Sequence, residues 1–189
     1  RFDAETLCRF VRAYQRVQPL TIGELWAVAI TLRIVLVENL RRTTEQIDRG
    51  RSAREQADDL ADRLLGVGGG RSEPLEVALL RLESRPLPTA FAVQLVLRLR
   101  EQDPAVTPAL RWLDERLATQ GMTADGFVYQ EHQRLGASNV TVRNVVTSMR
   151  LLSAIDWSEL VESVSLVDDA LRAGSAFALM DFPTRDRYR

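Results

Sequence analysis

The chain has 189 residues, of which 46% are hydrophobic, and its 25 basic and 26 acidic side chains leave a net charge of −1. This length and composition suffice for a buried core, and the balance of charge argues against nucleic-acid binding, which usually requires a strongly basic surface. The single cysteine, Cys8, excludes an internal disulfide and fits a reducing compartment.

The first two predicted helices are marked by capping residues. Asp3 can cap a helix that runs to about Val17, and Pro19 interrupts the chain after it. Thr21 and Glu24 then form a capping box, in which two backbone N–H groups at the start of a helix find side-chain acceptors. A long second helix is therefore predicted from Thr21.

The stretch 22–37 within this second helix is mostly apolar, which raises the question of a membrane anchor. A spanning helix needs about 20 apolar residues with few charges, but Glu24 and Arg33 lie inside the stretch. Arg33 near the centre of a bilayer would cost about 2.5–3.5 kcal/mol. We therefore expect a core helix that does not span a membrane and that ends at Gly50. The side chains expected to be buried along it are Trp26, Ile30, Val37 and Leu40.

A third helix should begin directly after Gly50, because Ser52 and Glu55 repeat the capping box. Its buried side should hold Ala57, Leu60, Ala61, Leu64 and Leu65. The glycine-rich stretch 66–74 follows as a loop and as a candidate boundary between subdomains. It lacks the phosphate-binding pattern G-x-x-x-x-G-K-[ST], so a plain loop is the better interpretation.

The remainder of the chain also shows helical spacing of apolar residues. Helices are expected over about 74–82, from Thr89 until Asp103-Pro104 ends it, from Thr107 until Gly121 stops it, and over about 123–136, 139–153 and 156–172. In the last of these, Asp156 and Glu159 resemble a third capping box. The predicted fold class is thus all-α, a single bundle-like domain of about eight helices over residues 1–189. Both ends of the chain lie among helix-forming residues, so we expect a piece excised from a longer protein.

The candidates for catalysis are few. His132 is the only histidine, and neither it nor Cys8 has partners at metal-ligand spacing, so no metal or catalytic site is predicted. Adjacent carboxylates such as Asp168 and Asp169 point about 100° apart on a helix and should not converge. Arg143 and Arg150 share a helix face, where they could bind an anion or pair with Glu159 and Asp168.

Three long phrases of the chain resemble a known family. They are "YQRVQPLTIGELWAVAITLRIVLVENLRR", "EHQRLGASNVTVRNVVTSMRLLSAIDWSELVESVSLVDDALR" and "MDFPTRDRYR". Together they are similar to the amino-terminal region of the cyclic β-1,2-glucan synthases, which are large bacterial inner-membrane proteins. The likeness covers most of the chain and weakens between about residues 66 and 88.

The resemblance implies a multi-domain parent enzyme with membrane helices, a glycosyltransferase domain that uses UDP-glucose with a divalent metal, and a phosphorylase-like domain. The present chain lacks the D-x-D and Q-x-x-R-W motifs of such transferases; Pro108 stands where the glutamine would precede Arg111-Trp112. No catalytic, cofactor-binding or metal-binding residue can therefore be assigned to it.

The expected function is a non-catalytic helical scaffold that contacts other domains of the same polypeptide at the cytoplasmic face of the inner membrane. The alternative is a regulatory module that binds glucan or nucleotide, which would require exposed aromatic platforms. We expect the last residues to be poorly ordered or held by a neighbouring copy, because a helix that barely begins is unstable alone. The candidate interface residues are Arg143, Arg150, Asp181, Phe182, Arg185 and Tyr188.

Overall fold

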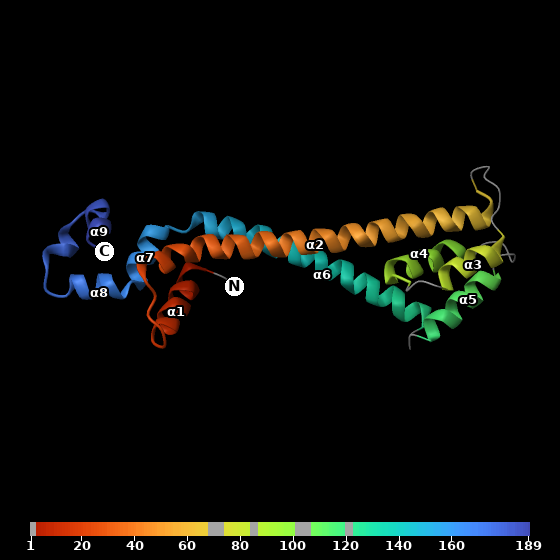
Figure 1. The fold of residues 1–189 in the computed structure, drawn as a ribbon, viewed down its shortest axis with the longest axis horizontal. Coiled ribbons are helices and arrows are strands. Elements are labelled where there is room, and N and C mark those ends of the chain that lie inside the picture. Colours follow the sequence, from red (N-terminus) through yellow and green to blue (C-terminus); the bar gives the residue numbers. More distant parts are fainter. Residues whose placement is uncertain (1–2, 68–73, 84–86, 101–106, 120–122) are drawn as a thin grey trace. The chain divides into compact units, whose positions relative to one another are not determined.

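The computed structural model describes residues 3–67, 74–83, 87–100, 107–119 and 123–189. Within these ranges the regular structure consists of nine α-helices and one 3₁₀ helix, without a strand, so the predicted all-α class is confirmed (Figure 1). The helices are α1 (Ala4–Gln15), α2 (Ile22–Leu65), α3 (Leu75–Glu83), α4 (Thr89–Leu99), α5 (Thr107–Ala118), α6 (Ala124–Ala154), α7 (Trp157–Val164), α8 (Leu166–Arg172), the 3₁₀ helix η2 (Ala176–Leu179) and α9 (Phe182–Tyr188).

The chain forms two compact units. The first contains residues 1–41 and 142–189, and the second contains residues 42–141. Helices α2 and α6 each contribute residues to both units. The expected loop at 66–74 falls largely outside the described residues, although Gly66 ends α2 with a φ of 67°, a left-handed geometry that favours glycine.

The core of the first unit is built around α1 and α7, which lie in contact. Besides apolar packing, α1 donates hydrogen bonds to the last carbonyls of α7: Arg12 Nε reaches Ser163 O at 3.1 Å and Gln15 Nε2 reaches Val164 O at 2.7 Å. These side chains satisfy carbonyls that a helix end leaves without partners. The buried apolar residues are Leu7, Val11, Leu25, Leu160, Val161 and Val164.

The core of the second unit is formed by the later part of α2 together with α3, α4, α5 and the start of α6. The predicted buried side of the third helix is confirmed: Ala57, Leu60 and Ala61 are buried, and Leu64 and Leu65 pack against the cluster half-buried. Small alanines on α2 face the larger side chains of α4 and α5. The latter include Phe91, Val93, Leu95, Val96, Leu99, Leu113 and Leu117.

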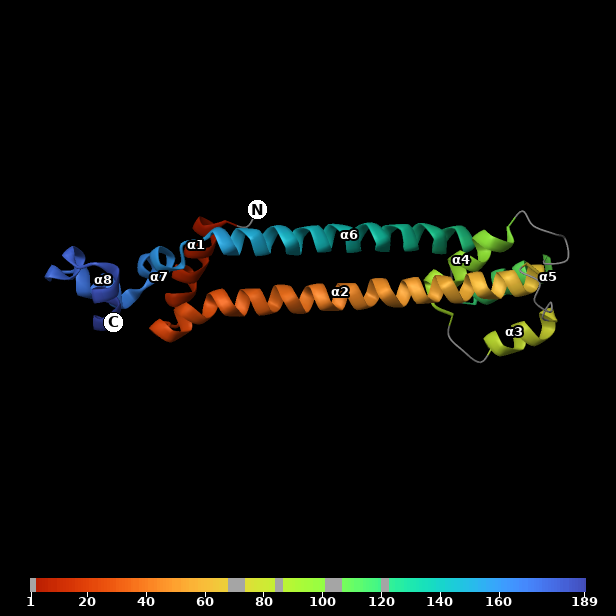
Figure 2. The same ribbon diagram turned by 90° about the horizontal axis from the view of Figure 1, so that it is seen from above.

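Helix α2 is longer than predicted, because it continues without a break through Gly50 to Leu65 (Figure 2). The prediction that Gly50 ends the helix was wrong. A glycine inside a helix costs only about 1 kcal/mol relative to alanine, which the packing of the following turns outweighs. Gly50 is buried, and a Cβ there would lie 2.7 Å from Nη2 of Arg134 on α6. The glycine therefore makes room for this arginine.

Gly50→Ala should lower stability, despite the better helix propensity of alanine, because its methyl group would displace the guanidinium of Arg134. That guanidinium is held by two hydrogen bonds to the buried carboxylate of Glu131, so it cannot move without weakening them. We expect a net loss of about 1–2 kcal/mol, measured by urea denaturation. A gain in stability would show that Arg134 can move aside freely.

Gly136→Ala should have the opposite effect. Helix α6 also runs through its internal glycine, so the two predicted helices 123–136 and 139–153 form one helix. Nothing lies within 4 Å of a Cβ placed at Gly136. Alanine should therefore raise the free energy of unfolding by about 0.5–1 kcal/mol, because it restricts the unfolded chain without a clash. An unchanged or lower urea midpoint would contradict this.

The predicted helix 156–172 is divided into α7 and α8. Asp156 caps its start as expected, with Oδ1 accepting from the Glu159 N–H at 3.0 Å. Ser165 then adopts extended backbone geometry, ends α7 and caps α8, where its Oγ accepts from the Asp168 N–H at 3.1 Å. Ser165 and Asp168 are both fully buried, so this interruption places a carboxylate inside the first unit.

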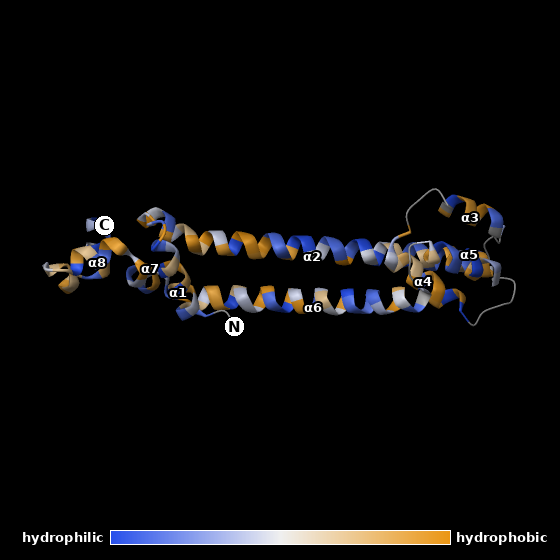
Figure 3. Ribbon diagram, turned by 90° about the horizontal axis from the view of Figure 1, so that it is seen from below, coloured by the Kyte–Doolittle hydropathy of each residue, from blue (hydrophilic) through white to orange (hydrophobic). Residues whose placement is uncertain are grey.

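The amino-terminal half of α2 is less buried than predicted. Hydrophobic residues recur along it (Figure 3), but Ile30 is 61% exposed and Val37 is 52% exposed, so the expectation that these two are buried was wrong. Trp26 and Leu40 are half-buried. Arg33 is held by Trp157, over whose ring its guanidinium lies at 5.8 Å. No helix in the described ranges is both long and apolar enough to cross a bilayer.

Candidate functional site

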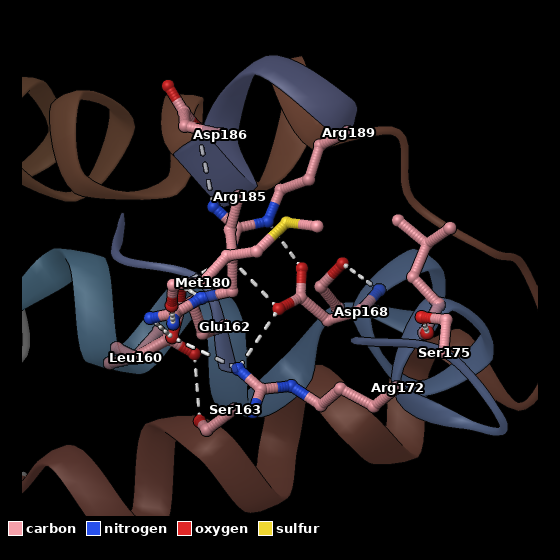
Figure 4. Close-up of polar contacts among 12 residues, drawn as sticks. Leu160, Glu162, Ser163, Asp168, Arg172, Ser175, Met180, Arg185, Asp186 and Arg189 are labelled. Carbon is pink, nitrogen blue, oxygen red and sulfur yellow. Dashed lines mark hydrogen bonds and ion pairs between the residues drawn. The ribbon is translucent and has the colours of Figure 1, made fainter. Parts of the chain in front are cut away.

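Charged side chains from α7, α8 and α9 converge in the first unit (Figure 4). We call the five residues that form this site the arginine cluster: Glu162, Asp168, Arg172, Arg185 and Arg189. Three guanidinium groups surround two carboxylates that lie on consecutive helices. The charges are therefore paired inside the cluster, with Asp186 as a further partner of Arg189 at 3.3 Å.

Asp168 and Arg189 form the most buried pair of the cluster. The Asp168 side chain is fully buried and that of Arg189 is 1% exposed. Arg189 donates through both Nε and Nη2, the latter at 2.9 Å from Oδ2, which is the bidentate geometry of strong arginine–carboxylate pairs. These bonds raise the pKa of Arg189 above its ordinary value, against the effect of burial.

Glu162 accepts hydrogen bonds from all three arginines of the cluster. Arg185 contributes two of them, with Nε at 2.8 Å and Nη2 at 3.0 Å. Arg172 Nη2 lies at 3.2 Å, and Arg189 also reaches this carboxylate. Burial acts to raise the pKa of Glu162, but the bonds from Arg185 and Arg189 outweigh it and hold the pKa below its ordinary value.

Stability should therefore fall in acid as Glu162 becomes protonated. A carboxyl group whose pKa is lowered by folding stabilises the protein fully when the pH is above its unfolded pKa, which is about 4.5 for Glu162. This stabilisation is lost as the pH falls through the lower pKa of the folded state. Urea midpoints measured from pH 7 downward should thus decline most steeply below about pH 4.5. Glu162→Gln should flatten this decline, whereas Glu159→Gln, at an exposed site on the same helix, should preserve it. Equal slopes for both variants would contradict the assignment.

Two phenylalanine rings lie close to the Arg189 guanidinium. The Arg189 guanidinium lies 5.9 Å from the Phe177 ring centroid and 5.4 Å from that of Phe182. Phe182 in turn meets Trp26 of α2 edge to face, with centroids 6.5 Å apart. Asp181 caps α9 by accepting from the Thr184 N–H at 3.1 Å. The ion pairs of the arginine cluster and the Phe182–Trp26 contact together hold the seven-residue helix α9 against α2, α7 and α8.

The structure brings together three of the six candidate interface residues. Arg185 belongs to the arginine cluster, Phe182 lies beside it, and Asp181 caps the same helix; Tyr188 is 65% exposed. The expectation that the last residues are poorly ordered or need a neighbouring copy was wrong, because contacts within the chain hold α9.

The other two candidates, Arg143 and Arg150, lie exposed on α6. The expected pairing of these arginines with Asp168 is not observed, since Asp168 bonds to Arg172 and Arg189 instead. Their role at an interface stays a prediction.

The described residues carry no convergent catalytic group beyond this paired cluster. His132 lies on the exposed side of α6, whereas its neighbour Glu131 is buried between Arg54 and Arg134. Asp168 is buried and Asp169 exposed, so these adjacent carboxylates point apart as predicted. Among the residues that the structure describes, no group of three or more histidine, cysteine or acidic side chains could hold a metal ion.

A second feature of the first unit is an apolar groove between α1 and α2, here called the α1–α2 groove. It has a volume of about 440 Å³, and all the surface that lines it is apolar. Phe10 and Tyr14 form its exposed wall and are 68% and 46% exposed. The other main lining residues are Leu7, Val11, Val28 and Leu32.

The sequence did not point to either feature. Glu162, Asp168 and Arg189 are separated by up to 27 residues and do not follow a single helical repeat. The only local signal was the third capping pattern at Asp156, which positions α7.

No family model matches the chain. One curated relative is 35% identical over 185 residues, which is 98% of this chain: the cyclic β-(1,2)-glucan synthase NdvB of Rhizobium meliloti (strain 1021). The matched region is 6% of that synthase, so the chain spans only a small part of its relative's length. The resemblance found in the sequence is thereby confirmed, and the chain is homologous to a small region of this cyclic β-(1,2)-glucan synthase.

Proposed function

We propose that the chain is a non-catalytic helical interaction domain of a cyclic β-(1,2)-glucan synthase polypeptide, where it contacts other domains of the same polypeptide. The observation that carries the proposal is the extent of the homology. It covers 98% of this chain but only 6% of the relative, as expected for one module of a much larger protein.

The chemistry of the described residues supports a role in contact rather than in catalysis. The carboxylates of Glu162 and Asp168, which are 14% and 0% exposed, are bonded to arginines, whereas a general acid–base pair needs access to a substrate. Large apolar side chains such as Phe10, Ile34 and Val17 are instead exposed. In this proposal UDP-glucose and its divalent metal bind in other domains, at the cytoplasmic face of the inner membrane.

The test is to express the synthase without this region and to supply residues 1–189 separately with an affinity tag. The tagged chain should capture the remaining polypeptide from detergent extracts and should restore part of its glucan synthesis. Alone, it should not turn over UDP-glucose with Mg²⁺ or Mn²⁺. Turnover by the isolated chain, or failure to bind the remaining polypeptide, would contradict the proposal.

The alternative, a glucan- or nucleotide-binding module, is tested by titrating the isolated chain with β-1,2-glucan and with UDP-glucose. Trp26 meets Phe182 edge to face, and the Arg33 guanidinium lies over the Trp157 ring, so both tryptophans already make contacts within the first unit. We expect no saturable change in tryptophan fluorescence. Saturation in the micromolar range would favour the alternative.

A further inference from the structure

We infer that a pocket in the second unit binds the phosphate group of a small ligand. The pocket is formed by the later part of α2, the start of α4 and one side chain of α6, and it is here called the α2–α4 pocket. Its volume is about 590 Å³, within the usual range of about 300–1,000 Å³ for small-molecule sites. Its main lining residues are Arg42, Glu45, Arg49, Thr89, Ala90 and Arg134. The inference goes beyond the proposed function, because contact between domains does not require a ligand.

Three arginines from two helices line the α2–α4 pocket. Arg42 and Arg49 are seven residues apart on α2 and therefore lie on one face of that helix. Arg134 comes from α6, and its guanidinium lies beside Gly50, which also lines the pocket. Ala53 and Ala90 add buried apolar surface to the lining. Charged groups beside such surface interact more strongly with a bound ion than they would in water.

The carboxylates near the pocket do not cancel this positive charge. Glu45 is the only acidic residue among those that line the pocket, and its Oε2 lies 3.8 Å from Nη2 of Arg49. Behind the pocket, Glu131 is shared between Arg134 and Arg54. The four guanidinium groups of Arg42, Arg49, Arg54 and Arg134 therefore stand against two carboxylates, which leaves two positive charges. This excess favours a dianion.

The start of α4 supplies hydrogen-bond donors at the same place. The residue before the helix is Pro88, and no side chain caps the helix, so the protein leaves N–H groups of the first turn without a side-chain acceptor. Thr89 and Ala90, which belong to that turn, both line the pocket. A helix start carries partial positive charge, and it adds to the charge that the arginines provide.

A phosphate group matches these donors better than other parts of a small ligand. Guanidinium groups bind phosphate oxygens through paired hydrogen bonds, and the N–H groups at a helix start accept the same partner. The residues that line the pocket include no aromatic ring, so a nucleoside base would find no stacking partner there. The ligand is therefore a compound recognised by its phosphate alone, either free in solution or as the headgroup of a lipid such as phosphatidic acid.

The first test is calorimetric titration of residues 1–189 with inorganic phosphate and with pyrophosphate at constant ionic strength. We expect saturable binding with a dissociation constant at or below about 1 mM. Arg49→Gln should weaken it at least fivefold. Arg51→Gln is the matched control, because Arg51 is similarly exposed, 74% against 83%, but lies outside the pocket; it should stay within twofold. Glu45→Gln should strengthen binding, because it removes the only carboxylate that lines the pocket.

The second test removes one donor from the start of α4. Thr89→Pro deletes an N–H at the first helical position, where proline is well tolerated, and Pro88 already has the extended geometry required before a proline, with φ −60° and ψ 138°. Phosphate affinity should fall at least threefold. Thr89→Ala, which removes the same side chain but keeps the N–H, should retain the affinity. Circular dichroism should show equal helix content in both variants.

Sedimentation with phosphatidylcholine vesicles, with and without phosphatidic acid, distinguishes the two sources of the phosphate group. Binding that requires phosphatidic acid and is lost in Arg49→Gln identifies a lipid headgroup, whereas phosphate binding without vesicle binding identifies a free compound. The inference is overturned by the absence of saturable phosphate binding, by equal losses in Arg49→Gln and Arg51→Gln, or by equal affinities of the two Thr89 variants. Tighter binding of UDP than of pyrophosphate would also overturn it, because the pocket would then recognise a base.

Discussion

Replacing Asp168 with Asn should lower the free energy of unfolding of the first unit by about 3–5 kcal/mol, which is the usual cost of leaving one member of a buried ion pair without its partner. Arg189 has a side chain only 1% exposed and bonds to both oxygens of Asp168. Asparagine keeps the shape of the side chain but removes its charge. The guanidinium would then stay buried with the half-buried Glu162 and the exposed Asp186 as its carboxylate partners.

Loss of this pair should first release α9. Phe182 lies near both the Arg189 guanidinium and the Trp26 ring. Trp26 fluorescence should therefore report on the release when the other two tryptophans are replaced by Phe. Asp169→Asn is the control, because Asp169 is exposed on the same helix and should change stability by less than about 0.5 kcal/mol. In a double-mutant cycle, Asp168→Asn and Arg189→Gln should show a coupling of more than about 1 kcal/mol. Additive effects would mean that the two side chains do not act as a pair.

The helices of this chain could be predicted from the sequence because their signals are local. The side chains of Asp3, Thr21 and Asp156 each accept a hydrogen bond from the backbone N–H three residues later. Such capping patterns can be recognised in the sequence without a tertiary structure. Apolar spacing likewise identified the buried side of α2 around Ala57 and Leu60. All of these features depend on residues within a turn or two of one another.

The helix ends predicted at Gly50 and Gly136 were wrong, because local sequence does not decide whether a glycine ends a helix. A glycine that ends a helix and one that lies inside it look alike in sequence, since the difference depends on what packs beside it. At Gly50 that neighbour is Arg134, 84 positions later in the printed sequence, whose guanidinium occupies the space of a missing Cβ. The arginine cluster was missed on the same grounds, because Arg189 meets Asp168 only after the chain has turned through η2.

The exposed residues of the first unit show a further limit of periodicity. Ile30 and Val37 were predicted to be buried, yet both are more than half exposed, as is Ile34, which lies between them at helical spacing. Apolar spacing identifies a face that is to be covered, but it does not say whether this chain or another segment covers it. This ambiguity is what the interaction role proposed above would resolve.

Arg134→Met should lower the free energy of unfolding of the second unit by about 2–4 kcal/mol, because it removes two of the three charge-assisted hydrogen bonds of a buried carboxylate. Glu131 is 3% exposed, and Arg134 donates to it from Nε and Nη2, each at 2.8 Å. These bonds raise the pKa of Arg134 above its ordinary value. Only Arg54, at 3.3 Å, would remain to balance the buried charge.

Arg51→Met is the control, since both side chains of the Arg51–Glu55 pair are exposed and the pair should contribute less than about 0.5 kcal/mol. Adding Glu131→Leu to Arg134→Met should recover much of the loss in urea denaturation, because no buried charge then remains. If the effects of Arg134→Met and Glu131→Leu simply add in the double variant, the two side chains are not coupled. The space that Gly50 leaves for Arg134 would then not serve this ion pair.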